Sequence, residues 1–244
     1  SIRAIESRAY LEPYEGSYRV FIFEDAECMS TEAANALLKT LEEPPPRCLF
    51  LLLTSRYERM LPTIISRCRS VELRPLPLTE VLQYISKNHS IQQTQADTIA
   101  RLSKGCLGWA ILALANPNIL EQRRSELESI ISLSDSPIEQ RFNAASNLAS
   151  LFYRDNREAQ GVLGVWLGWW RDLLLVREGA EESVYNLDYI EVLRDHARCY
   201  TSRQIASFTG RIVATLKALD HNVSARLSLE VLMLSMPGRE TALY

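Results

Sequence analysis

Two short apolar runs near the start of the chain flank a segment with helical periodicity. The runs cover residues 20–23 and 48–53, and nearly every position in each is apolar. This continuous pattern is typical of strands in a parallel sheet that is covered on both faces. Between them, apolar residues at helical spacing predict a helix over 31–41, which Ser30 caps and three consecutive prolines end. The pattern therefore predicts a β-α-β crossover whose strands are buried on both faces.

From residue 79 onward, every strong pattern is helical. A third strand is expected at 70–73, and the prolines that follow it mark a boundary. A charged helix at 118–132 is expected to be solvated, and Trp166, Trp169 and Trp170 have the spacing of core or interface packing. The other predicted helices lie at about 79–87, 95–104, 107–115, 138–153, 156–177, 186–198, 202–219 and 224–235.

Composition narrows the class of protein. The 244 residues include 27 basic and 30 acidic side chains, for a net charge of −3, so the chain shows no strong basic bias toward nucleic acid. Five scattered cysteines without a C-x-x-C pair make a structural zinc site unexpected and suit reduced thiols in the cytoplasm. The longest apolar stretch is too short to span a membrane, so no membrane association is expected.

Polar side chains follow both predicted strands. Glu24 and Asp25 come directly after the first, and Thr54 and Ser55 follow the second. Ligands of doubly wound sheets bind at the carboxyl ends of the strands, so these residues are the candidates for a nucleotide site. The alternative is that the carboxylates are solvated strand-end charges and the hydroxyls cap local backbone.

Two ordered stretches carry a family resemblance. ALLKTLEEPPP at 36–46, followed by LPTIISRC at 61–68, resembles the signature of bacterial DNA polymerase III clamp loader subunits, of the AAA+ superfamily, and among them the delta-prime class. The resemblance implies an α/β plus all-α fold: part of a P-loop NTPase-like parallel-sheet core at 1–74, a three-helix lid at 75–117, a connector helix at 118–134 and an all-helical collar at 135–244. It also implies that the chain lacks the N-terminal part of such a protein.

The resemblance implies a role in DNA replication. Such subunits form a ring with gamma/tau-type and delta-type subunits, within the DNA polymerase holoenzyme, and the ring loads the sliding clamp onto primer-template DNA in the cytoplasm. In the Ser66-Arg67-Cys68 motif, the arginine reaches across a subunit interface to ATP on the neighbour. A guanidinium suits this role because it is permanently charged and presents planar, paired donors to phosphate oxygens. The alternative is an arginine that pairs within its own domain.

Two departures from the family pattern argue against hydrolysis by this chain. Active members end the first strand with Asp then Glu, which serve Mg²⁺ and the attacking water, whereas Glu24 and Asp25 stand in the reverse order as a degenerate Walker B motif. Gly108 occupies the position of the lid's sensor arginine. No G-x-x-x-x-G-K-(S/T) pattern occurs in the 244 residues, but in the family this phosphate-binding loop precedes the segment present here.

We therefore expect no intrinsic ATPase activity, no metal and no cofactor bound by this chain, with ATP and Mg²⁺ on neighbouring subunits. Thr54 and Ser55 stand where active members place a γ-phosphate sensor. Two alternatives remain open: an active gamma/tau-type ATPase, and a helical scaffold that kept a decayed ATPase core.

Overall fold

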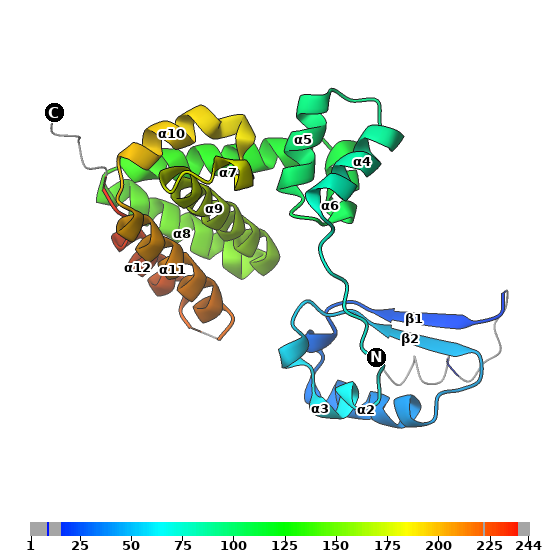
Figure 1. Ribbon diagram of the computed structural model, residues 1–244. Coiled ribbons are helices and arrows are strands. Elements are labelled where there is room, and N and C mark those ends of the chain that lie inside the picture. The colour runs from blue at the N-terminus through cyan, green and yellow to red at the C-terminus, as the bar shows by residue number, and fades with distance from the viewer. Residues whose placement is uncertain (1–8, 10–15, 222, 239–244) are drawn as a thin grey trace. The chain divides into compact units, whose positions relative to one another are not determined.

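The chain forms two compact units, Ser1–Arg74 and Pro75–Tyr244. The computed structural model describes residues 9, 16–221 and 223–238. Within this part of the chain, the first unit contains a small sheet and the second is helical (Figure 1). The observed fold is therefore mostly helical, with one two-stranded parallel sheet among the described residues.

The first unit is a β-α-β crossover followed by a short helix. Strands β1 (Arg19–Phe23) and β2 (Cys48–Leu52) pair in parallel, with Arg19 opposite Cys48 and Phe23 opposite Leu52. Parallel strands need a crossover connection, which α2 (Thr31–Glu42) supplies. The predicted cap is confirmed, since the Ala33 N–H donates to Ser30 Oγ at 3.2 Å. The other elements are η1 (Ala26–Cys28), η2 (Tyr57–Arg59) and α3 (Pro62–Ile65).

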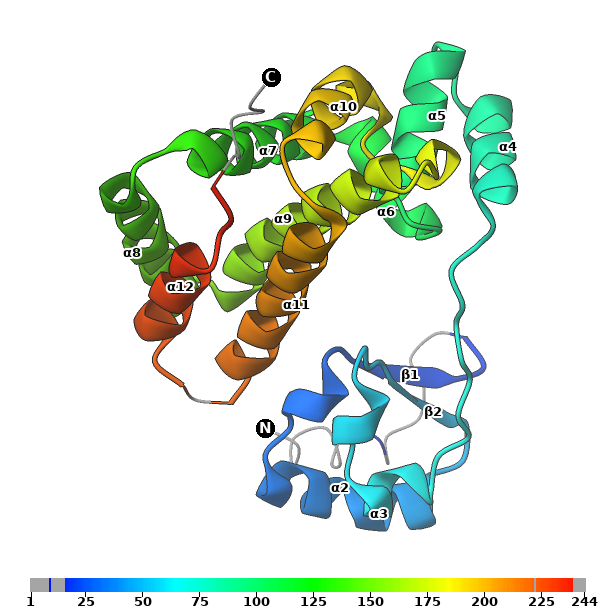
Figure 2. The same cartoon turned by 60° about the vertical axis from the view of Figure 1, so that its left-hand side comes forward.

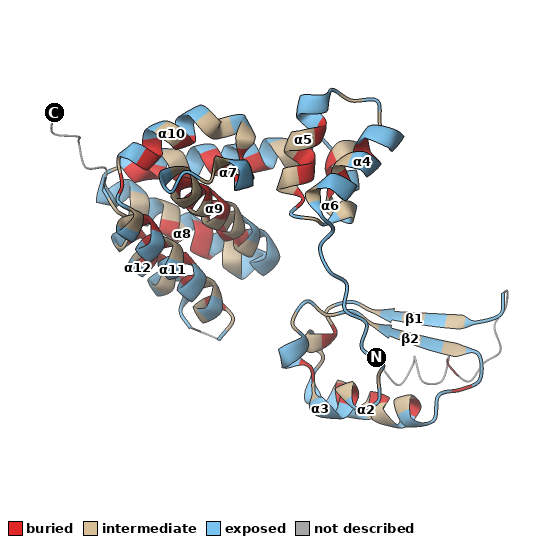
Figure 3. Cartoon of the chain, in the orientation of Figure 1, coloured by how far each residue is buried: buried red, intermediate tan, exposed pale blue. Residues whose placement is uncertain are grey.

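The sheet is covered on one face only. The prediction that both faces are buried is wrong for the described residues (Figure 3). Successive strand side chains point to opposite faces, and α2 and α3 pack against one of them, where Leu52 meets the buried Ala34 and Ile64. The other face leaves a row of apolar side chains exposed: Val20, Ile22, Leu49, Leu51 and Leu53.

An exposed segment leads from the first unit to the second. Residues 69–77 have no regular secondary structure and are exposed throughout. The strand expected at 70–73 is therefore absent. Its alternating apolar residues, Val71 and Leu73, have no described strand to pair with.

The second unit begins with three helices that share their own core. These are α4 (Leu78–Asn88), α5 (Gln93–Leu102) and α6 (Leu107–Ala115). Val81, Ile85 and Ile99 are buried between them. The pattern found these helices because each buries an apolar stripe against the others.

The remaining helices share a second core, in which α9 is central. They are α7 (Asn118–Asp135), α8 (Ile138–Arg154), α9 (Asn156–Arg177), η3 (Glu181–Ser183), η4 (Leu187–Tyr189), α10 (Ile190–Arg198), α11 (Ser202–Leu219) and α12 (Ala225–Leu234). Helix α9 contacts α7, α8, α10 and α11 (Figure 2), and its three tryptophans are buried, as predicted. The expectation of a solvated helix at 118–132 is wrong, because α7 buries Leu127 and Ile130 in this core.

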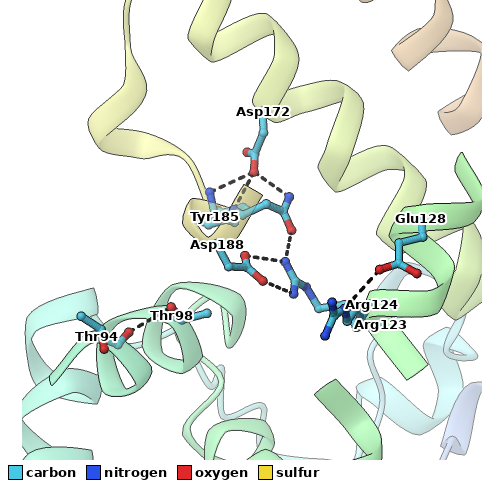
Figure 4. Close-up of polar contacts among 9 residues, drawn as sticks. Thr94, Thr98, Arg123, Arg124, Glu128, Asp172, Tyr185 and Asp188 are labelled. Atoms are coloured by element: carbon cyan, nitrogen blue, oxygen red, sulfur yellow. Dashed lines mark hydrogen bonds and ion pairs between the residues drawn. The ribbon is translucent and has the colours of Figure 1, made fainter. Parts of the chain in front are cut away.

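One buried carboxylate fixes the segment that follows α9. Asp172 is fully buried, and its Oδ2 accepts bonds from the Tyr185 and Asn186 N–H groups at 3.0 and 2.8 Å (Figure 4). Asn186 Nδ2 donates to the same oxygen at 2.7 Å, and Arg171 Nη1 donates to Oδ1 at 2.9 Å. Burial raises the pKa of the Asp172 carboxyl group, although its donors from Asn186, Arg171 and Tyr185 favour the charged form.

Two further helices hold the same segment, 179–189. Arg123 of α7 contacts both carboxylate oxygens of Asp188, at 2.8 and 3.0 Å. Arg101 of α5 donates to the Glu182 carbonyl oxygen at 2.7 Å. The segment therefore connects the α4–α6 group with the helices around α9, and Asp172 of α9 holds it through the backbone N–H groups of residues 185 and 186.

We predict that Asp172→Asn lowers the free energy of unfolding by about 3 kcal/mol or more. The substitution removes the negative charge that the donors of residues 171, 185 and 186 bind, and it places an amide N–H₂ group against them. Asp195→Asn is the matched control, since Asp195 forms an ion pair with Arg198 in which both side chains are mostly exposed. The control is expected to change the free energy by less than about 1 kcal/mol. Urea denaturation followed by circular dichroism measures both, and equal losses would contradict the anchoring role of Asp172.

Gly105 lies between α5 and α6, where the chain packs against residues 75–76. Its φ is +83°, and a Cβ added there would lie 2.5 Å from the Leu76 carbonyl oxygen and 2.7 Å from Pro75 Cβ. The Leu76 N–H also donates to the Gly105 carbonyl oxygen at 2.9 Å. Glycine is therefore required twice here, once by the backbone conformation and once by the close approach of 75–76.

We predict that Gly105→Ala lowers the free energy of unfolding by about 2–5 kcal/mol, from a left-handed backbone and from overpacking. Gly179→Ala is the matched control, because Gly179 has a φ of +78° but no atom within 4 Å of an added Cβ. It should cost only the backbone part, about 1–2 kcal/mol. Equal losses in urea denaturation would show that the approach of 75–76 does not constrain residue 105.

Candidate functional site

The carboxyl ends of the two strands are joined by backbone hydrogen bonds. The Leu53 N–H donates to the Phe23 carbonyl oxygen at 2.8 Å, and the Ala26 N–H donates to the Leu53 carbonyl oxygen at 2.9 Å. Glu24 is exposed, and Asp25 has a left-handed backbone, with φ at 49°. This turn directs the chain from β1 back across the end of β2.

The turn brings Glu27, rather than Glu24 or Asp25, to the hydroxyls that follow β2. The Ser55 hydroxyl donates to Glu27 Oε1 at 3.4 Å. Glu27 Oε2 is buried without a hydrogen-bond partner among the described residues. Thr54 Oγ1 accepts a bond from the Arg56 N–H at 3.0 Å, which is the local capping contact that the alternative interpretation of this hydroxyl predicts.

Glu27 is held in its charged form. Burial opposes ionisation, but hydrogen bonds from Thr54, its own backbone and Ser55, together with the charge of Arg56, outweigh burial and lower the pKa of Glu27. The strand ends therefore carry a carboxylate next to two hydroxyls. Sequence reasoning selected the two acidic residues nearest the strand and missed the third. The available signal was the short turn expected after the first strand. Such a turn can direct a later side chain, here Glu27, back toward the end of the second strand.

Arg67 lies two residues after the end of α3, and its side chain forms hydrogen bonds and an ion pair with residues of the first unit. Its Nε donates to Glu42 Oε1 at 2.6 Å, and its Nη2 forms an ion pair with the same oxygen. Its Nη1 donates to the Thr63 carbonyl oxygen at 2.9 Å and to Ser66 Oγ at 3.1 Å. The pair is not buried, since the side chains of Arg67 and Glu42 are 32% and 50% exposed. The guanidinium is thus both accessible and locally held.

The neighbours of Arg67 in the motif have structural contacts. Ser66 Oγ donates to the Thr63 carbonyl oxygen at 3.1 Å and also accepts from Arg67. Cys68 packs against the small core that contains Ile64, and burial raises the pKa of its thiol. A neutral, half-buried thiol is suited to packing rather than to nucleophilic chemistry.

The remaining candidate lies in the second unit. Gly108 is an exposed residue in the first turn of α6, and an added Cβ would meet no atom within 4 Å. In the part of the chain that the structure describes, no group of three or more His, Cys, Asp or Glu side chains is arranged to hold a metal ion. The described helices also include none long and apolar enough to cross a bilayer.

Comparison with known proteins shows similarity to DNA polymerase III subunits. The model of a family described as "DNA polymerase III, delta subunit" matches residues 1–77. The delta' subunit of DNA polymerase III from Bacillus subtilis is 25% identical over 238 residues, which cover 96% of this chain and 70% of the relative. The chain is therefore similar to subunits of the DNA polymerase III clamp loader, and the family model matches its first 77 residues.

Similarity to other clamp-loader proteins is strongest over part of the chain. The Escherichia coli delta' subunit is 39% identical over 103 residues, which cover 42% of this chain and 31% of the relative. A gamma/tau subunit from Mycobacterium bovis is 43% identical over 75 residues, 31% of this chain and 13% of the relative. The match with a solved gamma-subunit-related protein from Thermotoga maritima is 20% identical and covers 96% of this chain and 76% of that protein's chain, with a TM-score of 0.40.

We predict that Ser55→Ala and Thr54→Val each raise the pKa of Glu27, because each removes a hydroxyl that favours the carboxylate. A lowered carboxyl pKa stabilises the fold above its unfolded value, about 4.3, and this contribution is lost as the pH falls through the folded value. NMR titration of the Glu27 side chain measures the shift. Ser70→Ala is the control, since the Ser70 hydroxyl donates to Tyr57 Oη instead. An unchanged Glu27 pKa in both variants would contradict the assignment.

Proposed function

We propose that this chain is a clamp-loader subunit that hydrolyses no ATP itself and supplies an arginine finger to a neighbouring subunit. The observation that carries the proposal is the accessible guanidinium of Arg67, within Ser66-Arg67-Cys68 and two residues after the end of α3. A planar, permanently charged group at this position suits the charge that develops on a transferred phosphoryl group. The similarity to clamp-loader subunits supports a neighbouring subunit as the one that binds the ATP.

Features of the strand ends and of α6 support a non-hydrolysing role. Glu24 precedes Asp25 in the Walker B position, so the longer side chain stands where the metal-binding residue is expected. The left-handed backbone at Asp25 and the Arg56 N–H bond to Thr54 Oγ1 are the contacts of a local turn at the strand ends. Because residue 108 is a glycine, this position of α6 has no side chain to contact a nucleotide.

The helical organisation suits an assembly role. We assign the AAA+ core to 1–74, the lid to 75–117, the connector to 118–134 and the collar to 135–244. The separate cores of the α4–α6 group and of the helices around α9 support the division between lid and collar. The proposed partners are gamma/tau-type and delta-type subunits, which bind ATP and Mg²⁺. Contact with the sliding clamp and with primer-template DNA follows through the complex, in the cytoplasm.

One observation favours a second candidate. The ion pair between Arg67 and Glu42 lies within the first unit, as a purely structural arginine would require. In that case the chain is a helical scaffold that retains a decayed ATPase core, and Arg67 is dispensable for hydrolysis. The half-exposed state of the pair weighs against this role, because such pairs contribute only about 0–1 kcal/mol to stability.

We predict that Arg67→Ala lowers ATP hydrolysis by the reconstituted clamp loader about tenfold or more, since a finger in trans contributes large factors to phosphoryl transfer. The assay uses the full-length subunit with its cognate partners, clamp and primed DNA. Hydrolysis is measured at saturating ATP, after size-exclusion chromatography has verified assembly.

Arg69→Ala is the matched control, because Arg69 is an exposed arginine two residues away. It should leave hydrolysis unchanged. Full hydrolysis with Arg67→Ala in an intact complex would overturn the finger assignment and favour the scaffold.

A further inference from the structure

The guanidinium of Arg67 has almost no donor left for a phosphate. A guanidinium carries five N–H groups on three nitrogens. Glu42 Oε1 accepts the Nε–H and forms an ion pair with Nη2, and the Nη1 group donates to the Thr63 carbonyl oxygen and to Ser66 Oγ. All three nitrogens are therefore already engaged. Paired binding of a phosphate requires two neighbouring donors, so at least one of these contacts must open first.

Glu42 is the contact whose opening frees a complete binding edge. The Thr63 and Ser66 contacts come from residues four and one positions before Arg67 in the chain and engage Nη1 alone. Glu42 instead comes from the end of α2, 25 residues away, and covers the edge formed by Nε and Nη2. This edge presents two parallel donors, which is the geometry that a carboxylate and a phosphate both match.

The position of Glu42 makes the contact easy to exchange. Glu42 is the last residue of α2, where a negative charge is disfavoured by the helix dipole, and its side chain is 50% exposed. Exposed ion pairs are weak and are screened by salt. A phosphate, with more negative charge than a carboxylate, competes well for such a guanidinium.

We propose that Glu42 is a positioning residue that covers the phosphate-binding edge of Arg67 until an incoming phosphate displaces it. The inference rests on the proposed role of Arg67 as a finger. Glu42 acts through Arg67 and does not touch the nucleotide. It keeps the side chain folded onto α3 in the free chain, so that Arg67 engages a phosphate only when the neighbouring subunit presents one.

The first test measures phosphate binding by the full chain, without the assembly. Nitrogen-15 NMR of the arginine side chains follows the Arg67 Nε–H during titration with inorganic phosphate, and Arg67→Lys assigns the resonance. Glu42→Gln is expected to lower the phosphate concentration at half-saturation roughly two- to fivefold, the range of an exposed ion pair. The difference should shrink at about 1 M KCl, where charges are screened within a few ångströms.

Glu43→Gln is the matched control, because Glu43 is the next exposed carboxylate and has no described contact with Arg67. It should leave the Arg67 titration unchanged. An equal phosphate affinity in wild type and Glu42→Gln, or a resonance that does not respond to phosphate in either, would overturn the inference.

The second test uses the reconstituted clamp loader. Glu42→Gln is expected to raise hydrolysis at subsaturating concentrations of the subunit, and to change nothing when Arg67 is already alanine. Lower hydrolysis in Glu42→Gln would show that the ion pair orients the finger productively, and would overturn the inference. If Arg67→Ala itself has no effect, the proposed function fails, while the phosphate titration still decides the role of Glu42.

Discussion

The parallel pairing of β1 with β2 is the constraint on which the first unit depends. Two parallel strands cannot be joined by a tight turn, so a helix must carry the chain back to the start of the sheet. That helix, α2, ends at Glu42 and is stopped by the prolines at 44–46. The same geometry therefore sets both candidate sites. It brings the strand ends together around Glu27 and places a carboxylate beside Arg67.

The two ends of the crossover differ in how exposed their charged groups are. At the strand ends, Glu27 Oε2 is buried, and hydrogen bonds from the neighbouring hydroxyls and backbone favour its charged form. At the end of α2, the Arg67 side chain is 32% exposed, and the Glu42 carboxylate that covers one of its edges is 50% exposed. An exposed ion pair can exchange its partner, whereas a partly buried carboxylate is suited to fixing a turn. This contrast supports the proposal that Arg67, rather than the strand ends, is the functional site.

The helical unit is stabilised in a different way. Its core is apolar around α9, but the segment at 179–189 is fixed by a carboxylate that is fully withdrawn from water. Removing Asp172 from water costs free energy that only well-placed donors offset, and the donors come from Tyr185, Asn186 and Arg171. The arginines of α5 and α7 then reach the same segment. A polar anchor of this kind specifies one arrangement, because an alternative packing would leave the carboxylate unpaired.

The sequence by itself determined what depends on neighbours along the chain. Apolar spacing placed α2, α8, α9 and α11 with bounds close to those observed, and Ser30 capped α2 as predicted, because caps and helical faces are local properties. The ordered motif ending at Cys68 indicated the clamp-loader subunits to which the chain is similar. Residues 20–23 and 48–53 were recognised as strands, but their apolar content could not say how many faces are covered.

Only the tertiary structure decided which side chains meet. Ser55 contacts Glu27 across 28 residues, and Arg67 contacts Glu42 across 25. Periodicity carries no information about such contacts, so the acidic residues nearest the strand were chosen over Glu27. The buried state of Asp172 was equally hidden, because its position beside Arg171 suggests a solvated charge until the segment at 179–189 folds over it. Helix capping and apolar periodicity can be recognised in the sequence because they depend on neighbouring residues. Contacts between distant segments depend on how the whole chain packs.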